Sequence, residues 1–190
     1  MPDLSSNNRK QLLALARQAI RTYLETGMNL DRNVSLPDPW GRGGDEALEK
    51  FCAGCFVTLR KKGTLRGCIG TFDSARPLLD NVVRMAIAAA AQDTRFPPLT
   101  QSELREVQIS LSILGGLERV QCIEEIEIGR HGVYVKHGIR SGTFLPEVAV
   151  EQKWSREEFV VFCARQKAGL RPEECAAAEV YRYEVDQFSE

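Results

Sequence analysis

The segment from residue 51 to residue 72 constrains the fold most, because two strand-like runs flank a short turn there. The runs AGCFVTL and TLRGCIGTF are separated by RKKG, and Gly63 suits the left-handed position of a three-residue loop. We therefore expect an antiparallel hairpin in which Phe56 pairs with Cys68. Pairing of this local kind disfavours a doubly wound parallel sheet.

The rest of the chain mixes helical and strand patterns. Apolar residues recur at helical spacing in residues 6–25 and 77–92, and Pro97 forbids continuation of the second helix. The other expected elements are helices starting at the capping boxes Thr100–Glu103 and Ser155–Glu158, strands at 107–114 and 180–185, and a second hairpin at 133–145. This mixed order favours an α+β fold.

Length and charge restrict the function classes. The chain has 190 residues and a net charge of −1. It suits one domain and lacks the basic field that nucleic acids or anionic membranes attract. No apolar run approaches the roughly 18 residues of a membrane span, and the first residues lack the apolar centre of a signal peptide. We expect a cytoplasmic protein with reduced cysteines and a long loop at residues 28–46.

Side chains of the first hairpin alternate between two faces. One face carries Arg66, Cys68 and Gly70 together with Gly54, Phe56 and Thr58. The other face is predicted to be core and carries Cys55, Val57, Leu59, Leu65, Gly67 and Ile69. Arg66 lies two residues, roughly 7 Å, from Cys68, and a nearby cation favours the thiolate form of a cysteine. Gly70 leaves room for a ligand or for another backbone. The alternative is that Cys68 is a small packing residue.

The run GCFVTLRKKGTLRGCIGTF resembles the signature segment of the AMMECR domain family, known in microbes as protein A of the AmmeMemoRadiSam system. Further stretches agree in order, among them AAAAQDTRFPPL, ISLSIL, GRHGVYV, FLPEVA and KAGL. The resemblance covers nearly the whole chain after about residue 52. We therefore expect one AMMECR-type domain over residues 1–190, with an N-terminal helix and loop in about residues 1–50 and a core from about residue 51 to residue 188.

The resemblance implies an α+β fold built around a strongly curved, barrel-like, mostly antiparallel sheet with flanking helices and two related lobes. It also implies a cleft near LRGCIG. We assign ligand binding in this cleft to Arg66, Gly67, Gly70, Thr58 and Arg95. Family members are often encoded beside a Memo-type protein and a radical SAM protein, which suggests both as partners in a shared pathway.

A nucleophilic Cys68 needs a base. Of the two histidines, His131 in GRHG fits a family motif, whereas His137 falls in a turn expected to be exposed. Glu147, in LPEV, is the best carboxylate partner because it falls in the first turn of an expected helix. The alternatives are that His131 bonds a loop backbone and that Glu147 stabilises the helix dipole.

Asp93 and Arg95 flank the end of the alanine-rich helix. Arg95 either contacts an anion in the cleft or forms a local ion pair with Asp93. The CAGC segment at residues 52–55 would place its two cysteines on opposite strand faces, and no second pair completes a zinc site. We expect neither a metal nor a cofactor.

Two functions remain open from the sequence. The first is an enzyme that acts on a small or modified anionic substrate, with Cys68, His131 and Glu147 as catalytic residues. The second is a non-catalytic module that binds a small molecule or a modified side chain for a partner protein. A weaker third reading, an RNA-linked role, would need a basic patch at the hairpin tip, where Lys61 and Lys62 lie.

Overall fold

The computed structural model describes residues 4–30 and 45–190, so most of the loop predicted at residues 28–46 lies outside the described residues. The chain divides into two compact units. The N-terminal unit comprises residues 2–114 and 186–190, and the C-terminal unit comprises residues 115–185. Each unit has its own strands, helices and apolar core.

Three antiparallel strands form the sheet of the N-terminal unit. They are β1 (Cys55–Lys61), β2 (Thr64–Thr71) and β3 (Val107–Leu114), in the order β2-β1-β3. The last residues of β7 (Glu179–Ser189) run beside β3. Among the described strands β2 pairs with β1 alone, so it forms an edge of the sheet.

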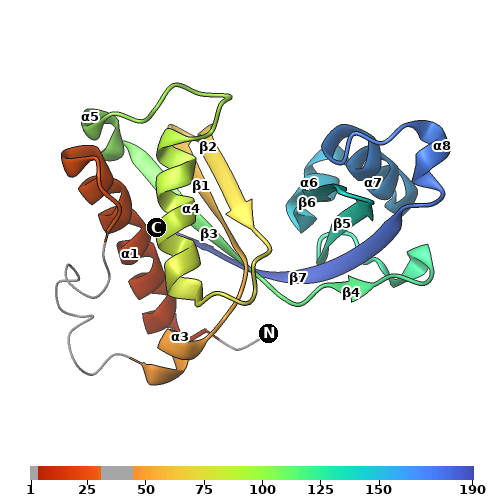
Figure 1. The fold of residues 1–190 in the computed structure, drawn as a ribbon, viewed down its shortest axis with the longest axis horizontal. Helices are drawn as coiled ribbons and strands as arrows, with labels where there is room; N and C mark the ends of the chain where they lie inside the picture. Colours follow the sequence, from red (N-terminus) through yellow and green to blue (C-terminus); the bar gives the residue numbers. More distant parts are fainter. Residues whose placement is uncertain (1–3, 31–44) are drawn as a thin grey trace. The chain divides into compact units, whose positions relative to one another are not determined.

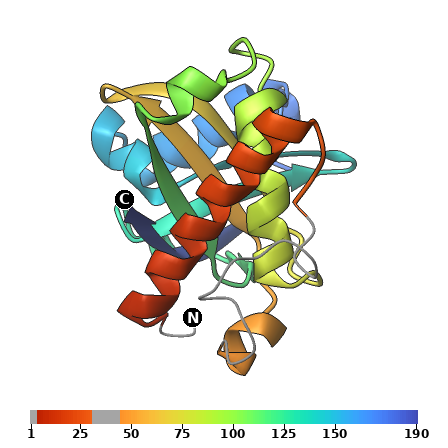
Figure 2. The ribbon, with the colours of Figure 1, turned by 90° about the vertical axis from the view of Figure 1, so that its left-hand side faces the viewer.

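Two long helices of the N-terminal unit lie side by side against this sheet, as Figures 1 and 2 show. They are α1 (Ser6–Thr26) and α4 (Leu78–Ala91), and both agree with the predicted helices to within about one residue at each end. Gly27 ends α1 in the left-handed conformation, with φ of 73°. Two short helices complete the unit, α3 (Glu46–Lys50), which the sequence analysis missed, and α5 (Gln101–Leu104), which starts at the predicted capping box.

The C-terminal unit has a similar set of strands. They are β5 (His131–His137), β6 (Arg140–Phe144) and the first part of β7, in the order β6-β5-β7, and the short β4 (Glu118–Arg119) also pairs with β7. All these pairings are antiparallel. The hairpin predicted at residues 133–145 is therefore confirmed.

The helical elements of the C-terminal unit are short. They are the 3-10 turn Ile123–Glu125, α6 (Pro146–Gln152), α7 (Arg156–Phe162), the π-helical turn Cys163–Lys167 and α8 (Pro172–Cys175). The predicted capping box of Ser155 and Glu158 starts α7. Rings of Phe144, Trp154 and Phe159 pack together in the core, so aromatic contacts supplement the short helices.

The register of the first hairpin corrects the sequence analysis. The loop contains two residues, Lys62 and Gly63, both with positive φ, in place of the predicted three-residue loop. Arg66 is an extra, bulged residue in β2, and Cys68 therefore pairs with Thr58. Each error shifts the pairing by one residue. Together they shift it by two, so the predicted alternation of faces beyond the bulge is preserved.

The α+β class with antiparallel strands and flanking helices is thus confirmed. Within the described ranges, no helix combines the length and the apolar character needed to cross a membrane.

Candidate functional site

The backbone of Cys68 is held on both sides by the segment that follows α4. The Cys68 N–H donates to Oδ2 of Asp93 at 2.8 Å, and the Cys68 carbonyl accepts from Nη2 of Arg95 at 3.1 Å. Since β2 is an edge strand, these two groups would otherwise face away from the sheet. Asp93 and Arg95 thus stand in for a neighbouring strand and fix Cys68 in place.

Asp93 and Arg95 form a close ion pair. Nη2 of Arg95 lies 2.7 Å from Oδ2 of Asp93, and Nε donates to Oδ1 at 2.9 Å. The hydrogen bond from Arg95, supported by the backbone N–H groups of Cys68 and Arg95, lowers the pKa of Asp93 to about 2 although burial opposes it. The Asp93 carboxylate is therefore charged throughout the physiological range. The local ion pair that the sequence analysis considered as one alternative is present. The hydrogen bonds from this pair to the Cys68 backbone were not predicted.

The thiol of Cys68 differs from the packing cysteines of the protein. Its Sγ lies 3.3 Å from Oγ1 of Thr58, and the residue is only half-buried. Cys55 and Cys163 are fully buried, and burial raises the pKa of each thiol to about 12. Those two thiols are inert small hydrophobes. Cys68 is more exposed than either of these residues, and its role as a nucleophile stays a prediction.

Arg66 makes a second clamp beside the site. Its guanidinium lies 3.1 Å from Oε2 of Glu103 and donates to the carbonyls of Pro97 and Pro98 at 2.9 and 3.3 Å. Arg66 is the first cause of the lowered pKa of Glu103, which is about 2. With its side chain only 13% exposed, Arg66 ties β2 to the loop that precedes α5. A contact of Arg66 with a ligand stays a prediction.

The glycines of the signature make room for neighbouring parts of the protein. A Cβ at Gly67 would stand 2.2 Å from the Ala89 carbonyl oxygen, so this glycine lets α4 approach β2. A Cβ at Gly70 would stand 2.2 Å from the ring of Phe56. The space above Gly70 is thus filled by an aromatic ring, and the ligand-binding roles of both glycines also stay predictions.

His131 belongs to the C-terminal unit, where it is buried at the start of β5. Its Nδ1 accepts the Glu127 N–H at 3.0 Å, which is the backbone contact that the sequence analysis considered as the alternative. Burial, followed by the charge of Arg182, lowers the pKa of His131. The neutral ring consequently carries its proton on Nε2.

A polar pocket of about 250 Å³ surrounds His131 in the C-terminal unit. Its charged lining residues are Glu118, Glu127, Arg130, Arg182 and Glu184. Most of these side chains pair with one another, for example Arg130 with Glu184 at 2.8 Å. Glu147 is half-buried in the first turn of α6, as predicted, and does not line this pocket. Within this unit the structure therefore does not bring His131 and Glu147 into one pocket.

The grip on Cys68 was missed in the sequence analysis. Asp93 and Cys68 are 25 residues apart in the sequence, and neither residue by itself predicts the contact. The available signal was the pattern D-x-R directly after a helix that packs on an edge strand. Such a pair of charges can serve the exposed N–H and carbonyl groups of that edge.

Comparisons with known proteins agree with this description. A family model described as AMMECR1 matches residues 13–188. Protein MK0488 of Methanopyrus kandleri is 39% identical over 190 residues, which cover 94% of this chain and 86% of that protein. Protein PF1979 of Pyrococcus furiosus is 36% identical over 192 residues, with coverage of 94% and 86%. The crystal structure of uncharacterized protein PH0010 from Pyrococcus horikoshii has a TM-score of 0.86 and 32% identity, and covers 98% of this chain and 93% of that one.

Proposed function

This chain belongs to the AMMECR1 family, and on that premise we propose that it is a cysteine-dependent enzyme acting on a small or modified anionic substrate. The observation that carries the proposal is the position of Cys68. Its N–H and carbonyl are both held by the Asp93–Arg95 pair, whereas its thiol is half-buried and contacts the Thr58 hydroxyl. A nucleophile benefits from such fixation because a small displacement of the reacting atom costs rate.

Arg95 supplies the recognition of an anion. Its Nε and Nη2 are occupied by Asp93 and by the Cys68 carbonyl, while Nη1 makes no hydrogen bond to the described residues. The side chain is 52% exposed. The hydrogen bonds that Arg95 donates to Asp93, and to a lesser degree the negative charge of Asp93, raise the pKa of Arg95. A carboxylate or phosphate group on Nη1 would therefore sit beside Cys68.

The proposed step is addition of the Cys68 thiolate to an electrophilic carbonyl carbon of the substrate. A sulfur lone pair forms the new S–C bond, and the π electron pair of the C=O group moves onto its oxygen. The thiol proton passes to water before the attack. His131 and Glu147, which lie in the C-terminal unit, stay sequence-based predictions for the residues that transfer protons.

The resemblance to the AMMECR domain family suggests that the proposed reaction belongs to a pathway shared with Memo-type and radical SAM proteins. Under this proposal the protein holds or converts an anionic intermediate that those partners produce or use. Near-neutral net charge gives no support to a nucleic-acid substrate.

The test is the rate at which iodoacetamide labels individual cysteines as a function of pH. We expect Cys68 to react at neutral pH at least about tenfold faster than the exposed Cys52, and Arg95→Met to remove most of this difference. Cys52 serves as the control within the same molecule. If Cys68 reacts only near pH 8.5, as an ordinary thiol does, and no faster than Cys52, the nucleophile assignment is wrong.

A second function, a non-catalytic binding module, is favoured by the open Nη1 of Arg95, since this group can hold an anion without any reaction at Cys68. Genetic complementation separates the two functions. A folded Cys68→Ser variant that restores the pathway supports the binding module. A folded variant that fails to do so, while Cys52→Ser succeeds, supports the enzyme.

A further inference from the structure

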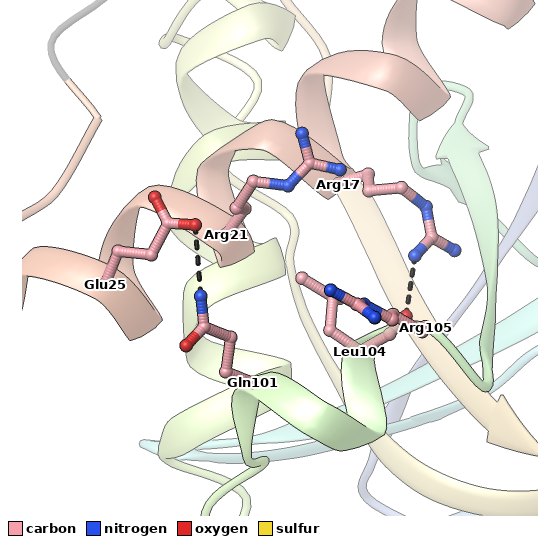
Figure 3. A pocket seen from close by; sticks show the side chains of 6 residues that line it. All are labelled: Arg17, Arg21, Glu25, Gln101, Leu104 and Arg105. Atoms are coloured by element: carbon pink, nitrogen blue, oxygen red, sulfur yellow. Dashed lines mark hydrogen bonds between the residues drawn. The ribbon is translucent and has the colours of Figure 1, made fainter.

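A separate pocket of about 210 Å³ lies between α1 and α5 in the N-terminal unit, and Figure 3 shows the side chains around it. None of the signature residues lines it. The lining residues are Arg17, Arg21, Glu25, Gln101, Leu104 and Arg105. Three guanidinium groups and one carboxylate thus lie around a small space.

The sequence of α1 brings two of these arginines to one face. Arg17, Arg21 and Glu25 follow at intervals of four residues, so their side chains lie in a row along the helix. Two like charges at this spacing destabilise an isolated helix slightly. A carboxylate at position 25 could offset Arg21, but Glu25 instead accepts a hydrogen bond from Gln101 at 3.1 Å (Figure 3).

The three arginines differ in how they are used. Arg17 is anchored, because it pairs with Glu190 and donates to the carbonyls of Leu104 and Val107 at 2.7 Å. Among the described residues, the Arg21 side chain has only a long contact of 3.4 Å with the side chain of Gln18. The guanidinium of Arg105, the residue after the last turn of α5, has no hydrogen-bond or ion-pair partner among these residues. Two guanidinium groups at one pocket therefore lack an ion-pair partner in the described part of the chain.

We propose that this pocket binds the phosphate group of a small molecule, with Arg21 and Arg105 as its ligands. Guanidinium groups present paired N–H donors that match phosphate oxygens, and two such groups together counter the double charge of a phosphate monoester. The volume corresponds to about seven water molecules, which suits a phosphate with a few further atoms. Arg17, held by Glu190, forms one wall of the pocket.

Glu25 makes one end of the proposed site negative, whereas the arginines make the other end positive. Its carboxylate stands on the side of Gln101 and can accept a hydrogen bond from a hydroxyl group of the bound molecule. The same negative charge repels a bare phosphate. A phosphorylated polyol is consequently the class of ligand that matches both ends of the pocket.

The experiment is titration of the full chain with inorganic phosphate and with glycerol 3-phosphate at constant ionic strength, followed by isothermal calorimetry and by NMR of the arginine Nε–H groups. We expect glycerol 3-phosphate to bind more tightly than phosphate, and Arg105→Ala to weaken both by about tenfold or more. Arg84→Ala is the matched control, since Arg84 is exposed on α4 outside the pocket. It should leave binding unchanged.

A variant that removes the negative charge of Glu25 makes the test more specific. Glu25→Gln keeps the acceptor for Gln101 and removes the negative charge, so inorganic phosphate should bind a few fold more tightly. The Arg105 guanidinium makes no hydrogen bond or ion pair with the described residues, so Arg105→Ala should keep the melting temperature of the parent. The proposal is overturned if neither ligand binds, if Arg84→Ala weakens binding as much as Arg105→Ala, or if Glu25→Gln weakens phosphate binding.

Discussion

Each unit contains one hairpin, β1–β2 in the N-terminal unit and β5–β6 in the C-terminal unit. Counted from the loop, the paired residues of the two hairpins correspond one to one, apart from the bulge at Arg66. Both close on a two-residue loop, after Lys61 in one and after His137 in the other. In both units the first strand of the hairpin is central and also pairs with a later strand, β3 or β7. The two units therefore share a strand–strand–helix–strand arrangement, as the family resemblance implied for two related lobes.

Equivalent glycines follow from this correspondence. Gly67 pairs with Leu59 and Gly142 pairs with Val135, at the same distance from the loop when the bulge is removed. A Cβ at Gly67 would meet the backbone of α4, and a Cβ at Gly142 would meet the backbone of Ala168 at 2.4 Å. In each unit a glycine lets the helical segment that follows the hairpin approach its second strand.

The residues after these glycines show where the units differ. Cys68 opposes Thr58 in one unit, and Thr143 opposes Tyr134 in the other. The Thr143 hydroxyl is fully used, because it donates to the Val133 carbonyl at 2.8 Å and lies 2.6 Å from the Tyr183 hydroxyl. The equivalent position thus serves stability in the C-terminal unit. In the N-terminal unit it presents a half-buried thiol on a strand edge that Asp93 and Arg95 secure.

The largest loss of stability is expected when the glycine that both hairpins share is replaced. Gly67→Ala and Gly142→Ala should each lower the free energy of unfolding by about 2–3 kcal/mol, because the new methyl group would overlap backbone atoms that cannot move aside. Urea denaturation measures the loss. Gly116→Ala is the control, since no atom lies within 4 Å of its Cβ position. A loss in only one of the two variants would refute the equivalence of the hairpins.

The next prediction concerns the hydrogen bonds by which Asp93 and Arg95 hold the Cys68 backbone in the N-terminal unit. Asp93→Asn should cost about 2 kcal/mol at pH 7, because the folded state lowers the pKa of Asp93 to about 2. A carboxyl group with a lowered pKa stabilises the fold above its unfolded pKa and loses this contribution as the pH falls. The difference between parent and variant should therefore shrink from about pH 4 and vanish near pH 2.

Asp73→Asn is the matched control for this pH dependence, since its partner Arg76 is largely exposed and such pairs contribute little. Unfolding curves recorded at several pH values decide the matter. A constant difference between Asp93→Asn and the parent from pH 7 to pH 2 would show that Asp93 acts without its charge.

The smallest expected effect is a difference in the free energy of unfolding between substitutions at Thr143 and at the equivalent position, Cys68. Thr143→Val should lower the free energy of unfolding by about 1–2 kcal/mol through its two lost hydrogen bonds. Cys68→Ala should cost less than about 1 kcal/mol, because its thiol makes a single hydrogen bond to the described residues and Cys68 is only half-buried. If Cys68→Ala costs as much as Thr143→Val, Cys68 is a packing residue and the comparison loses its functional meaning.

Local signals allowed most elements to be predicted from the sequence. The capping boxes at Thr100 and Ser155 start helices in the structure, and Gly27 ends α1. These signals work because a cap satisfies N–H or carbonyl groups within a few residues of itself. The five-residue helix at Glu46–Lys50 was missed, since so short a segment has no apolar periodicity to detect.

The bulge at Arg66 could not be predicted in the same way. An extra residue in a strand depends on what the partner strand and the adjoining loop require, and here Arg66 reaches Glu103 and the carbonyls of Pro97 and Pro98. The expected role of Arg66 beside Cys68 relied on an unbulged strand. The alternation of faces beyond it was nevertheless correct, because the two register errors added up to two residues.

The sequence by itself determined the element types, the core faces and the family, because these depend on periodicity, on caps and on a specific signature. It also pointed to Cys68. Only the tertiary structure decided that Asp93 and Arg95 hold the backbone of Cys68 and that the Arg105 guanidinium lines a pocket without an ion-pair partner among the described residues. Such contacts join segments far apart in the chain, and their geometry depends on how helices dock on a sheet edge, which no local pattern encodes.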